Sequence, residues 1–233
     1  MGDHCTAVVR WCSKAPNKKI NVTGGKARRP VIFAVRQPRI EKRDKRVLRL
    51  SMKNDNVIIV PYDPNWLEIY ERESKLIQST CGIDILKIEH IGSTSITGQK
   101  AKPIIDMMAA VGSVDASSHL LNVLEGIGYE EIQTGMRERI FLRKRGIDDL
   151  QFYHFHLVNI SSWGERKERI MRDYLKQNPT YVREYGVLKE RLSQLYPDDD
   201  SLEYTKAKTD FIQNLMDKAC DKLGRPKIDV WND

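Results

Sequence analysis

The sequence predicts an α+β fold, in which a mixed sheet with its helices is followed by a C-terminal helical segment. Over residues 57–159, short apolar runs of strand length are separated by glycine turns and by two stretches of helical spacing. Over residues 163–220, apolar residues recur at helical spacing, with breaks at Asn178-Pro179 and Pro197-Asp198. Strands followed by helices in this way are typical of an α+β domain.

The first elements are expected in the following order. Residues 57–60 form a short buried strand, and Asp63-Pro64 opens a helix. The apolar face of that helix carries Trp66, Ile69, Tyr70, Leu76 and Ile77. Residues 85–91 form a strand that ends at a Gly-Ser turn. Residues 103–111 have almost no polar face, which predicts a central strand that is buried on both sides.

The later elements continue this pattern. A helix covers residues 120–127 and ends at Gly128, and three more strands follow it. Those strands are expected at residues 129–133, 139–143 and 151–159. The last helix buries a stripe formed by Ile212, Leu215, Met216 and Ala219.

The first 55 residues differ in charge from the rest of the chain. They contain 15 Lys and Arg against 4 Asp and Glu, a net charge of +11, whereas residues 56–233 contain 24 against 28, a net charge of −4. We therefore expect a basic leader (1–55), a folded domain (56–222) and a C-terminal tail (223–233). The leader is interpreted as a disordered segment, as an organellar targeting segment, or as an extension upstream of a start at Met52. Nucleic acid is not an expected partner, because the positive charge belongs to the leader.

Composition excludes several classes of protein. Hydrophobic residues make up 40% and charged residues 30% of the chain, and no apolar run approaches the roughly 20 residues of a membrane helix. No membrane partner is therefore expected. The four cysteines are scattered without a CxxC pair, which argues against a zinc ribbon or a disulfide scaffold and favours a cytoplasmic location.

The most informative segment surrounds the Gly-Ser turn. Gly92, Ser93 and Thr94 follow a strand, and Asp106 lies thirteen residues beyond Ser93 inside an apolar run. Such a turn offers backbone N–H groups and hydroxyls to phosphate oxygens, and a carboxylate is a ligand that Mg²⁺ prefers. The alternative is a structural turn beside a buried acid that pairs with a basic residue such as Lys102.

Three histidines fall on strands near this turn. His90 precedes it, and the alternation along a strand sends His154 and His156 to one face. If the strands are neighbours, Asp106 and one of these two histidines share a divalent metal and contribute to catalysis. The alternative is that the histidines only make hydrogen bonds or are exposed without a role.

Basic residues recur beside the expected strands and helices, at Arg139, Arg143, Arg172, Lys189 and Lys208. We expect phosphate contacts from Lys102, Arg139, Arg172 and Lys208. The alternative is that they face solvent or form surface pairs worth about 0–1 kcal/mol. The chain contains no P-loop, nucleophile elbow, HExxH or Rossmann fingerprint, which argues against P-loop kinases, serine hydrolases and dehydrogenases.

Motifs between about residue 57 and residue 219 resemble those of the GrpB family, which is described as predicted nucleotidyltransferases. The matching stretches are VIIVPYDPNW, IEHIGSTSITG, AKPIID, RIFLRK, HFHLV, MRDYLKQNP, EYGVLK and the Tyr204…Lys208 pair. The same domain is also found fused to dephospho-CoA kinase in some bacteria.

The resemblance implies a nucleotidyltransferase-like fold, an NTP as substrate, and Mg²⁺ or Mn²⁺ as cofactor. In that superfamily two acids spaced D-h-D bind the metal ions, and a third acid comes from a later strand. Asp106 matches the first acid, but Met108 stands at the second, and the later strand offers His154 and His156.

Three functions remain open at this point. The first is metal-dependent transfer of a nucleotidyl group to a hydroxyl of an unknown small-molecule or protein acceptor. The second is binding of a nucleotide or CoA-type ligand without catalysis, which the missing second acid favours. The third is a partner-binding or folding-assistance module that keeps the motifs for structural reasons.

Overall fold

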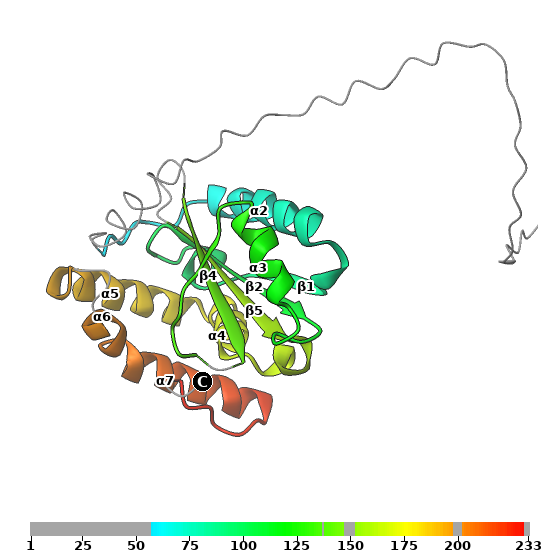
Figure 1. Ribbon diagram of the computed structural model, residues 1–233. Helices are drawn as coiled ribbons and strands as arrows, with labels where there is room; N and C mark the ends of the chain where they lie inside the picture. Colours follow the sequence, from blue (N-terminus) through cyan, green and yellow to red (C-terminus); the bar gives the residue numbers. More distant parts are fainter. Residues whose placement is uncertain (1–56, 137, 147–151, 198–201, 231–233) are drawn as a thin grey trace, which may run out of the picture. The chain divides into compact units, whose positions relative to one another are not determined.

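The computed structural model describes residues 57–136, 138–146, 152–197 and 202–230 (Figure 1). The expectations for the leader, including a start at Met52, lie outside the described residues. The break expected at Pro197-Asp198 lies only partly within them, because the described segment ends at Pro197.

Within the described residues, five strands form one mixed sheet in the order β1-β2-β5-β4-β3. The pairs β1/β2, β5/β4 and β4/β3 are antiparallel, and β2/β5 is parallel. The strands are β1 (Lys87–Ile91), β2 (Ile104–Val111), β3 (Glu130–Glu131), β4 (Arg139–Arg145) and β5 (Phe152–Asn159).

Helices occupy both faces of this sheet and the C-terminal part of the chain. The α-helices are α2 (Asn65–Cys81), α3 (Ser118–Glu125), α4 (Lys167–Lys176), α5 (Pro179–Leu195), α6 (Leu202–Lys206) and α7 (Thr209–Leu223). Short 3-10 helices are η1 (Gly82–Asp84), η2 (Ser93–Ser95) and η3 (Ile160–Glu165). At the start of α2, the Asp63 carboxylate accepts a hydrogen bond from the Asn65 N–H, which satisfies one N–H of the first turn.

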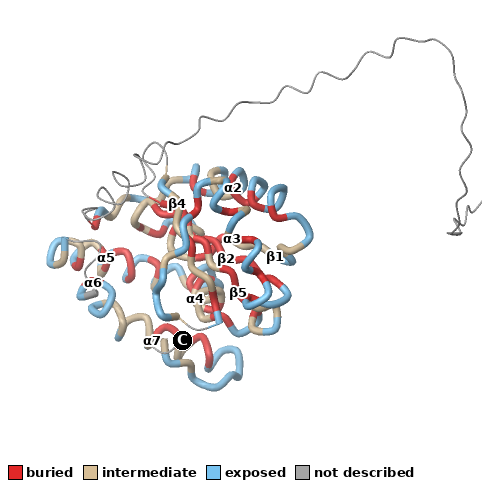
Figure 2. The backbone as a smooth tube through the Cα atoms, in the orientation of Figure 1, coloured by how far each residue is buried: buried red, intermediate tan, exposed pale blue. Residues whose placement is uncertain are grey.

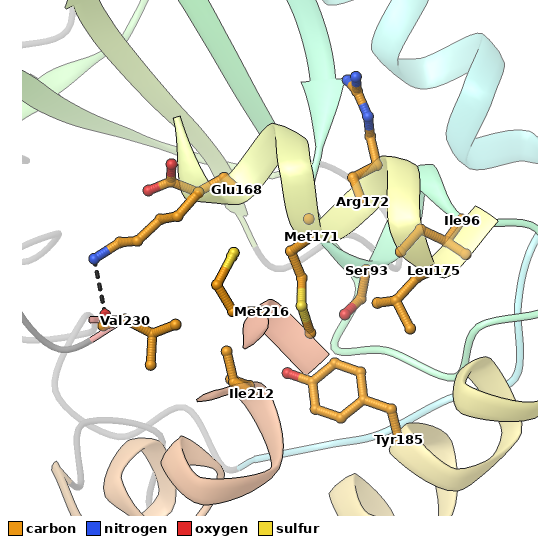
Figure 3. A pocket seen from close by; sticks show the side chains of 12 residues that line it. Ser93, Ile96, Glu168, Met171, Arg172, Leu175, Tyr185, Ile212, Met216 and Val230 are labelled. Carbon is orange, nitrogen blue, oxygen red and sulfur yellow. Dashed lines mark hydrogen bonds between the residues drawn. The ribbon is translucent and has the colours of Figure 1, made fainter. Parts of the chain in front are cut away.

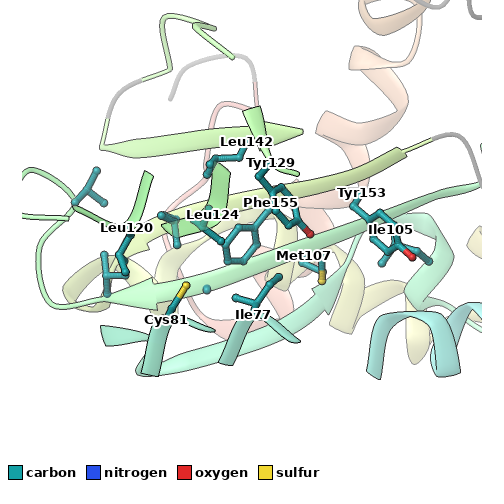
Figure 4. Close-up of a cluster of buried hydrophobic side chains, with 14 of the residues drawn as sticks. Ile77, Cys81, Ile105, Met107, Leu120, Leu124, Tyr129, Leu142, Tyr153 and Phe155 are labelled. Atoms are coloured by element: carbon teal, nitrogen blue, oxygen red, sulfur yellow. The ribbon is translucent and has the colours of Figure 1, made fainter. Parts of the chain in front are cut away.

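One sheet face packs against α2 and α3 to form the largest apolar core (Figure 4). Ile105 and Met107 of β2 and Phe155 of β5 point into this core and are fully buried. Ile77 of α2 and Leu124 of α3 cover them. The buried residues lie mainly along β2 and β5 at the centre of the molecule (Figure 2).

The opposite sheet face is covered by η3 and α4, and α7 packs on α4. Met108 and Ala110 of β2 form a small apolar cluster there with Val158 and Trp163. On the same face and nearer the start of β2, the polar side chains of Asp106 and His154 replace apolar ones. This face therefore carries the polar groups that the sequence singled out.

The structure confirms the α+β class, the mixed sheet and the C-terminal helical segment. It also confirms that the strand expected at residues 103–111 is interior, since β1 and β5 flank it. No helix among the described residues has the length and apolarity needed to cross a bilayer.

Two local expectations were wrong. Residues 57–60 do not form a strand, because only Val60 makes an isolated bridge, with Ala101. Leu76 does not belong to the buried face of α2 and is 39% exposed. An apolar helix face predicted from sequence includes positions at its edges. Which of these edge positions become buried depends on the element that packs against the helix.

Candidate functional site

The turn after β1 is built around Gly92. Its φ of 68° lies in the left-handed region, which residues with side chains rarely adopt. A Cβ at this position would overlap the Asp106 carboxylate, whose Cγ would be only 2.8 Å away. Gly92 thus allows the turn to lie directly against Asp106, and η2 carries Ser93 and Thr94 past the carboxylate.

Thr94 fastens this turn to the neighbouring strand. Its hydroxyl donates to the backbone oxygen of Ile104 at 2.8 Å and lies 3.0 Å from Nε2 of His90. Burial lowers the pKa of His90 to about 4, so its ring is neutral at pH 7. Because the Thr94 hydroxyl hydrogen is used by Ile104, His90 Nε2–H donates to the Thr94 oxygen.

Asp106 and His154 form a hydrogen-bonded pair across two parallel strands. The register of β2 and β5 places them opposite each other, and His154 Nδ1 lies 3.0 Å from Asp106 Oδ1. A carboxylate only accepts, so Nδ1–H donates to it, and Nε2 is the ring nitrogen that this hydrogen bond leaves available. Burial would raise the pKa of Asp106, but the His154 hydrogen bond and further histidines nearby hold it below its usual value.

His156 lies on the same face as His154, two residues farther along β5 and opposite Met108. Its Nδ1 is buried and has no hydrogen-bond partner among the described residues. Burial lowers the pKa of His156 to about 4, although the nearby Glu168 acts in the other direction. The ring is therefore neutral at pH 7 and has one unused nitrogen.

Lys189 of α5 reaches the turn from the C-terminal helices. Its Nζ donates to Ser93 Oγ at 2.9 Å, and the residue is only 4% exposed. Burial, together with the positive charges of Lys208 and Lys102, lowers the pKa of Lys189 to about 7. A buried lysine with a lowered pKa is typical of a functional site. An anion bound beside Lys189 would favour its ammonium form and restore its charge.

One cavity of about 300 Å³ is lined by the Gly-Ser turn, Asp106, His154 and Lys189. The residues predicted from sequence that line it are Gly92, Ser93, Thr94, Lys102, Asp106, His154 and Lys208. Sequence reasoning had not placed in the site three further lining residues: Tyr185, Lys189 and Tyr204. Tyr185 and Lys189 are four residues apart on α5, as are Tyr204 and Lys208 farther on, and this i,i+4 spacing was the available signal.

Three predicted site residues do not line this cavity. His156 is one of them. Arg139 Nη1 donates to Glu168 Oε1 at 2.7 Å. Arg172 pairs with Glu89 at 2.7 Å and donates to the backbone oxygen of His90 at 2.9 Å. In this arrangement the two arginines connect α4 to the sheet.

The protein side chains around Asp106 are too few to hold a metal ion by themselves, so a bound ligand would have to supply further coordinating atoms. Among the described residues, no group of three or more His, Cys, Asp or Glu side chains is placed to hold a metal ion by itself. Mg²⁺ is commonly held by one or two carboxylates together with substrate phosphates and water. Asp106 at a lysine-lined cavity fits that pattern, with phosphate oxygens supplying the other ligands.

Together the fold and this cavity define an α+β domain with a Gly-Ser turn, one carboxylate and several lysines at a shared site. The family model described as GrpB protein matches residues 56–218. This chain belongs to the GrpB family.

Relatives in two bacteria show how much of the chain is shared. This chain is 32% identical over 164 residues to the UPF0157 protein YqkA of Bacillus subtilis, and the aligned region covers 70% of this chain and 47% of YqkA. It is 31% identical over 176 residues to the glutamate-rich protein GrpB of Alkalihalophilus pseudofirmus, which covers 72% of this chain and 99% of that protein. The chain thus spans about half of YqkA and nearly all of GrpB.

Partial similarity to dephospho-CoA kinase is also present. Over 78 residues the chain is 33% identical to the enzyme of Mycobacterium bovis, which covers 32% of this chain and 19% of that protein.

Among solved structures, the conserved protein GrpB from Enterococcus faecalis has a TM-score of 0.64 and 33% identity, over 72% of this chain and all of that chain. At much lower similarity, the terminal uridylyl transferase 4 from Trypanosoma brucei with bound CTP aligns over 65% of this chain and 45% of that one, with a TM-score of 0.36 and 13% identity.

Proposed function

We propose that this chain is a metal-dependent nucleotidyltransferase that moves a nucleotidyl group from an NTP to an acceptor hydroxyl. The observation that carries the proposal is the cavity at the Gly92-Ser93 turn, where one carboxylate and three lysines line the same space of about 300 Å³. A triphosphate requires compact positive charge, and a divalent metal bound to it requires a hard oxygen ligand.

The triphosphate lies among Lys102, Lys189 and Lys208, beside the hydroxyl of Ser93. Lysine ammonium groups neutralise the negative charge that the leaving pyrophosphate develops. Ser93 already accepts a hydrogen bond from Lys189, so the two side chains act on the phosphates as a unit. The rings of Tyr185 and Tyr204 lie under two of these ammonium groups, Lys189 at 4.5 Å and Lys208 at 4.1 Å, which holds them in place.

Asp106 would hold the divalent metal, Mg²⁺ or Mn²⁺, and the metal would polarise the phosphoryl oxygens. The other ligand proposed from sequence is His156, but it does not line the cavity, and its Nδ1 is buried; it would reach a metal ion beside Asp106 only after a rearrangement of its ring. His154, held by Asp106 through Nδ1, has Nε2 as a proton acceptor. In the transfer step the acceptor oxygen bonds to the α-phosphorus, the bond to the bridging oxygen breaks, and the acceptor proton passes to His154.

A specific observation also supports a second candidate, a domain that binds a nucleotide or CoA-type ligand without catalysis. Asp106 is the one carboxylate among the described residues that line the cavity. Met108, at the position of the second acid, is fully buried in an apolar cluster. Two-metal transfer requires ligands for both ions. A domain that only binds its ligand needs no second acid, so one carboxylate with a methionine at the second position is also what such a domain would have.

Pyrophosphate release from each NTP separates these two functions. The reaction contains Mg²⁺ or Mn²⁺ and a pooled metabolite extract as the source of acceptors, and the wild type is compared with Asp106→Asn. Asparagine has the shape of aspartate, so the close approach of Gly92 and the hydrogen bond from His154 are retained. A transferase predicts metal-dependent release that the variant loses.

Two other results point elsewhere. Equal release by both proteins removes Asp106 from the mechanism. Nucleotide binding without release, measured by calorimetry, favours the non-catalytic domain.

A further inference from the structure

A second cavity lies on the other side of the Gly-Ser turn, between α4 and α7 (Figure 3). Its volume is about 260 Å³, whereas sites that enclose a whole drug-sized ligand have about 300–1,000 Å³. Most of its lining is apolar: Ile96, Met171, Leu175, Ile212, Met216 and Val230. The cavity therefore suits one apolar part of a larger ligand.

The second cavity adjoins the lysine-lined one. Gly92, Ser93 and Tyr185 line both. A space that favours anionic groups and a space that favours apolar groups thus lie on two sides of the same turn. A single ligand with phosphates at one end and an apolar group at the other matches this arrangement.

Two methionines favour an aromatic ring as the apolar group. Met171 comes from α4 and Met216 from α7, and Figure 3 shows both thioethers at the cavity. A thioether sulfur makes favourable contacts with aromatic rings, often at the ring edge, and its unbranched side chain adapts to the shape of a ligand. A planar ring between these two helices would contact a sulfur from each.

The charged residues of the lining are already engaged within the protein. Lys167 Nζ donates to the backbone oxygen of Val230 at 2.8 Å, the contact drawn in Figure 3. Arg172 pairs with Glu89 at 2.7 Å. One oxygen of Glu168 accepts from an arginine of β4, and the other is fully buried and does not face the cavity. These side chains stabilise the walls and do not select the ligand.

The hydroxyl of Tyr185 is a polar group that remains available to a ligand. Within the described part of the chain its Oη makes no hydrogen bond, and it is not among the enclosed polar atoms. Figure 3 shows the hydroxyl pointing towards Met171 and Ile212. Burial raises the pKa of Tyr185, so the hydroxyl keeps its proton at pH 7 and can both donate and accept.

We propose that this cavity binds the base of the nucleotide whose phosphates lie among the lysines. The ring system lies between Met171 and Met216, and its polar edge is hydrogen-bonded to Tyr185 Oη. This placement rests on the proposed function, because the nucleotide is the substrate of the proposed transfer.

NMR of the protein with isotope-labelled methionine methyl groups tests the placement directly. In the presence of Mg²⁺ and ATP, the methyl groups of Met171 and Met216 are expected to show NOEs to the base protons. Tripolyphosphate, which has no base, serves as the control ligand and should give no change at these two signals. Met107 is the internal control, because it is fully buried in the core on the other face of the sheet. Met171→Leu and Met216→Leu assign the two signals.

Calorimetry with a cavity-filling variant tests the same site by affinity. Ile212→Trp is expected to weaken ATP at least about tenfold and tripolyphosphate by less than about twofold, because only ATP has a base to exclude. The matched control is Leu223→Trp, since Leu223 is 54% exposed on the same helix. Thermal denaturation checks that each variant is folded.

Tyr185→Phe isolates the hydrogen bond to the base. It keeps the ring beneath Lys189 and removes only the hydroxyl, so ATP should bind about three- to tenfold more weakly, with tripolyphosphate unchanged. The wild type should bind ATP and GTP within about threefold of each other, because a rotating hydroxyl pairs with a donor or an acceptor. A preference above about tenfold between these two purines contradicts recognition by Tyr185.

The base site is overturned if bound ATP gives no NOE to either methionine, or if Ile212→Trp weakens ATP and tripolyphosphate equally. Pyrophosphate release separates this inference from the proposed function. If the NOEs appear but no NTP releases pyrophosphate, nucleotidyl transfer fails and the base site stands. If ATP releases pyrophosphate with the same KM in Ile212→Trp and in the wild type, transfer stands and the base site fails. If ATP does not bind, both fail.

Discussion

Replacing Lys189 should change how nucleotide binding depends on pH. The pKa of this lysine is lowered to about 7 in the free protein, by burial and by the neighbouring Lys208 and Lys102. At pH 8 it is then protonated in about one molecule in ten. A bound triphosphate favours the ammonium form and raises the pKa back towards the ordinary value near 10.5.

The expected magnitude follows from that difference. Binding of ATP at pH 8 should take up about 0.9 proton at Lys189. Binding takes up a proton and does not release one, because the pKa of Lys189 is lower in the free protein than in the complex. The affinity for ATP is therefore at its maximum below about pH 7, and it falls by about tenfold per pH unit between about pH 7 and pH 10.

Calorimetry in two buffers with different heats of ionisation measures the proton uptake directly. Lys189→Met should lose the uptake and flatten the pH dependence. Lys75→Met is the matched control, since Lys75 is exposed on α2 and does not line the cavity. The reasoning is refuted if the wild type takes up no proton at pH 8, or if Lys189→Met takes up as much.

Three further predictions concern stability and can be measured by chemical denaturation. Gly92→Ala should lower the free energy of unfolding by at least about 1–3 kcal/mol, because it forces a left-handed backbone and a contact with Asp106. Glu73→Ala should cost about 3–5 kcal/mol, because it leaves the ammonium of Lys144, now 2.7 Å from the Glu73 carboxylate, without its partner. Phe155→Ala should cost about 3–5 kcal/mol, because the side chain is fully buried in the core between the sheet and its helices.

Each of these has a control within the chain. Asp106→Ala should make Gly92→Ala milder in a double-mutant cycle, and additive effects would contradict the proposed contact. Replacing Glu73 and Lys144 together by methionine should cost less than Glu73→Ala alone. Leu67→Ala, at a residue that is 53% exposed, should change stability by less than about 0.5 kcal/mol; a loss as large as that of Phe155→Ala would contradict the burial argument.

The sequence by itself determined the elements with strong local patterns. The run from Ile104 to Val111 is apolar at almost every position, so it could only be an interior strand, and Asp106 stood out within it. Gly92 could be identified as a turn residue because it joins the end of a strand to Ser93. These inferences succeed because burial and turn geometry leave their mark within a few neighbouring residues.

Only the tertiary structure decided which residues meet. His154 is 48 residues from Asp106 in sequence, and the parallel register of two strands makes it, rather than His156, the hydrogen-bonded partner. Lys189 is 96 residues from Ser93 and reaches it through the packing of α5. Arg172, expected at phosphate, is held by Glu89 instead. Strand order, register and helix packing depend on contacts between distant segments, and so do the pKa values that burial sets, which is why a local pattern could not give them.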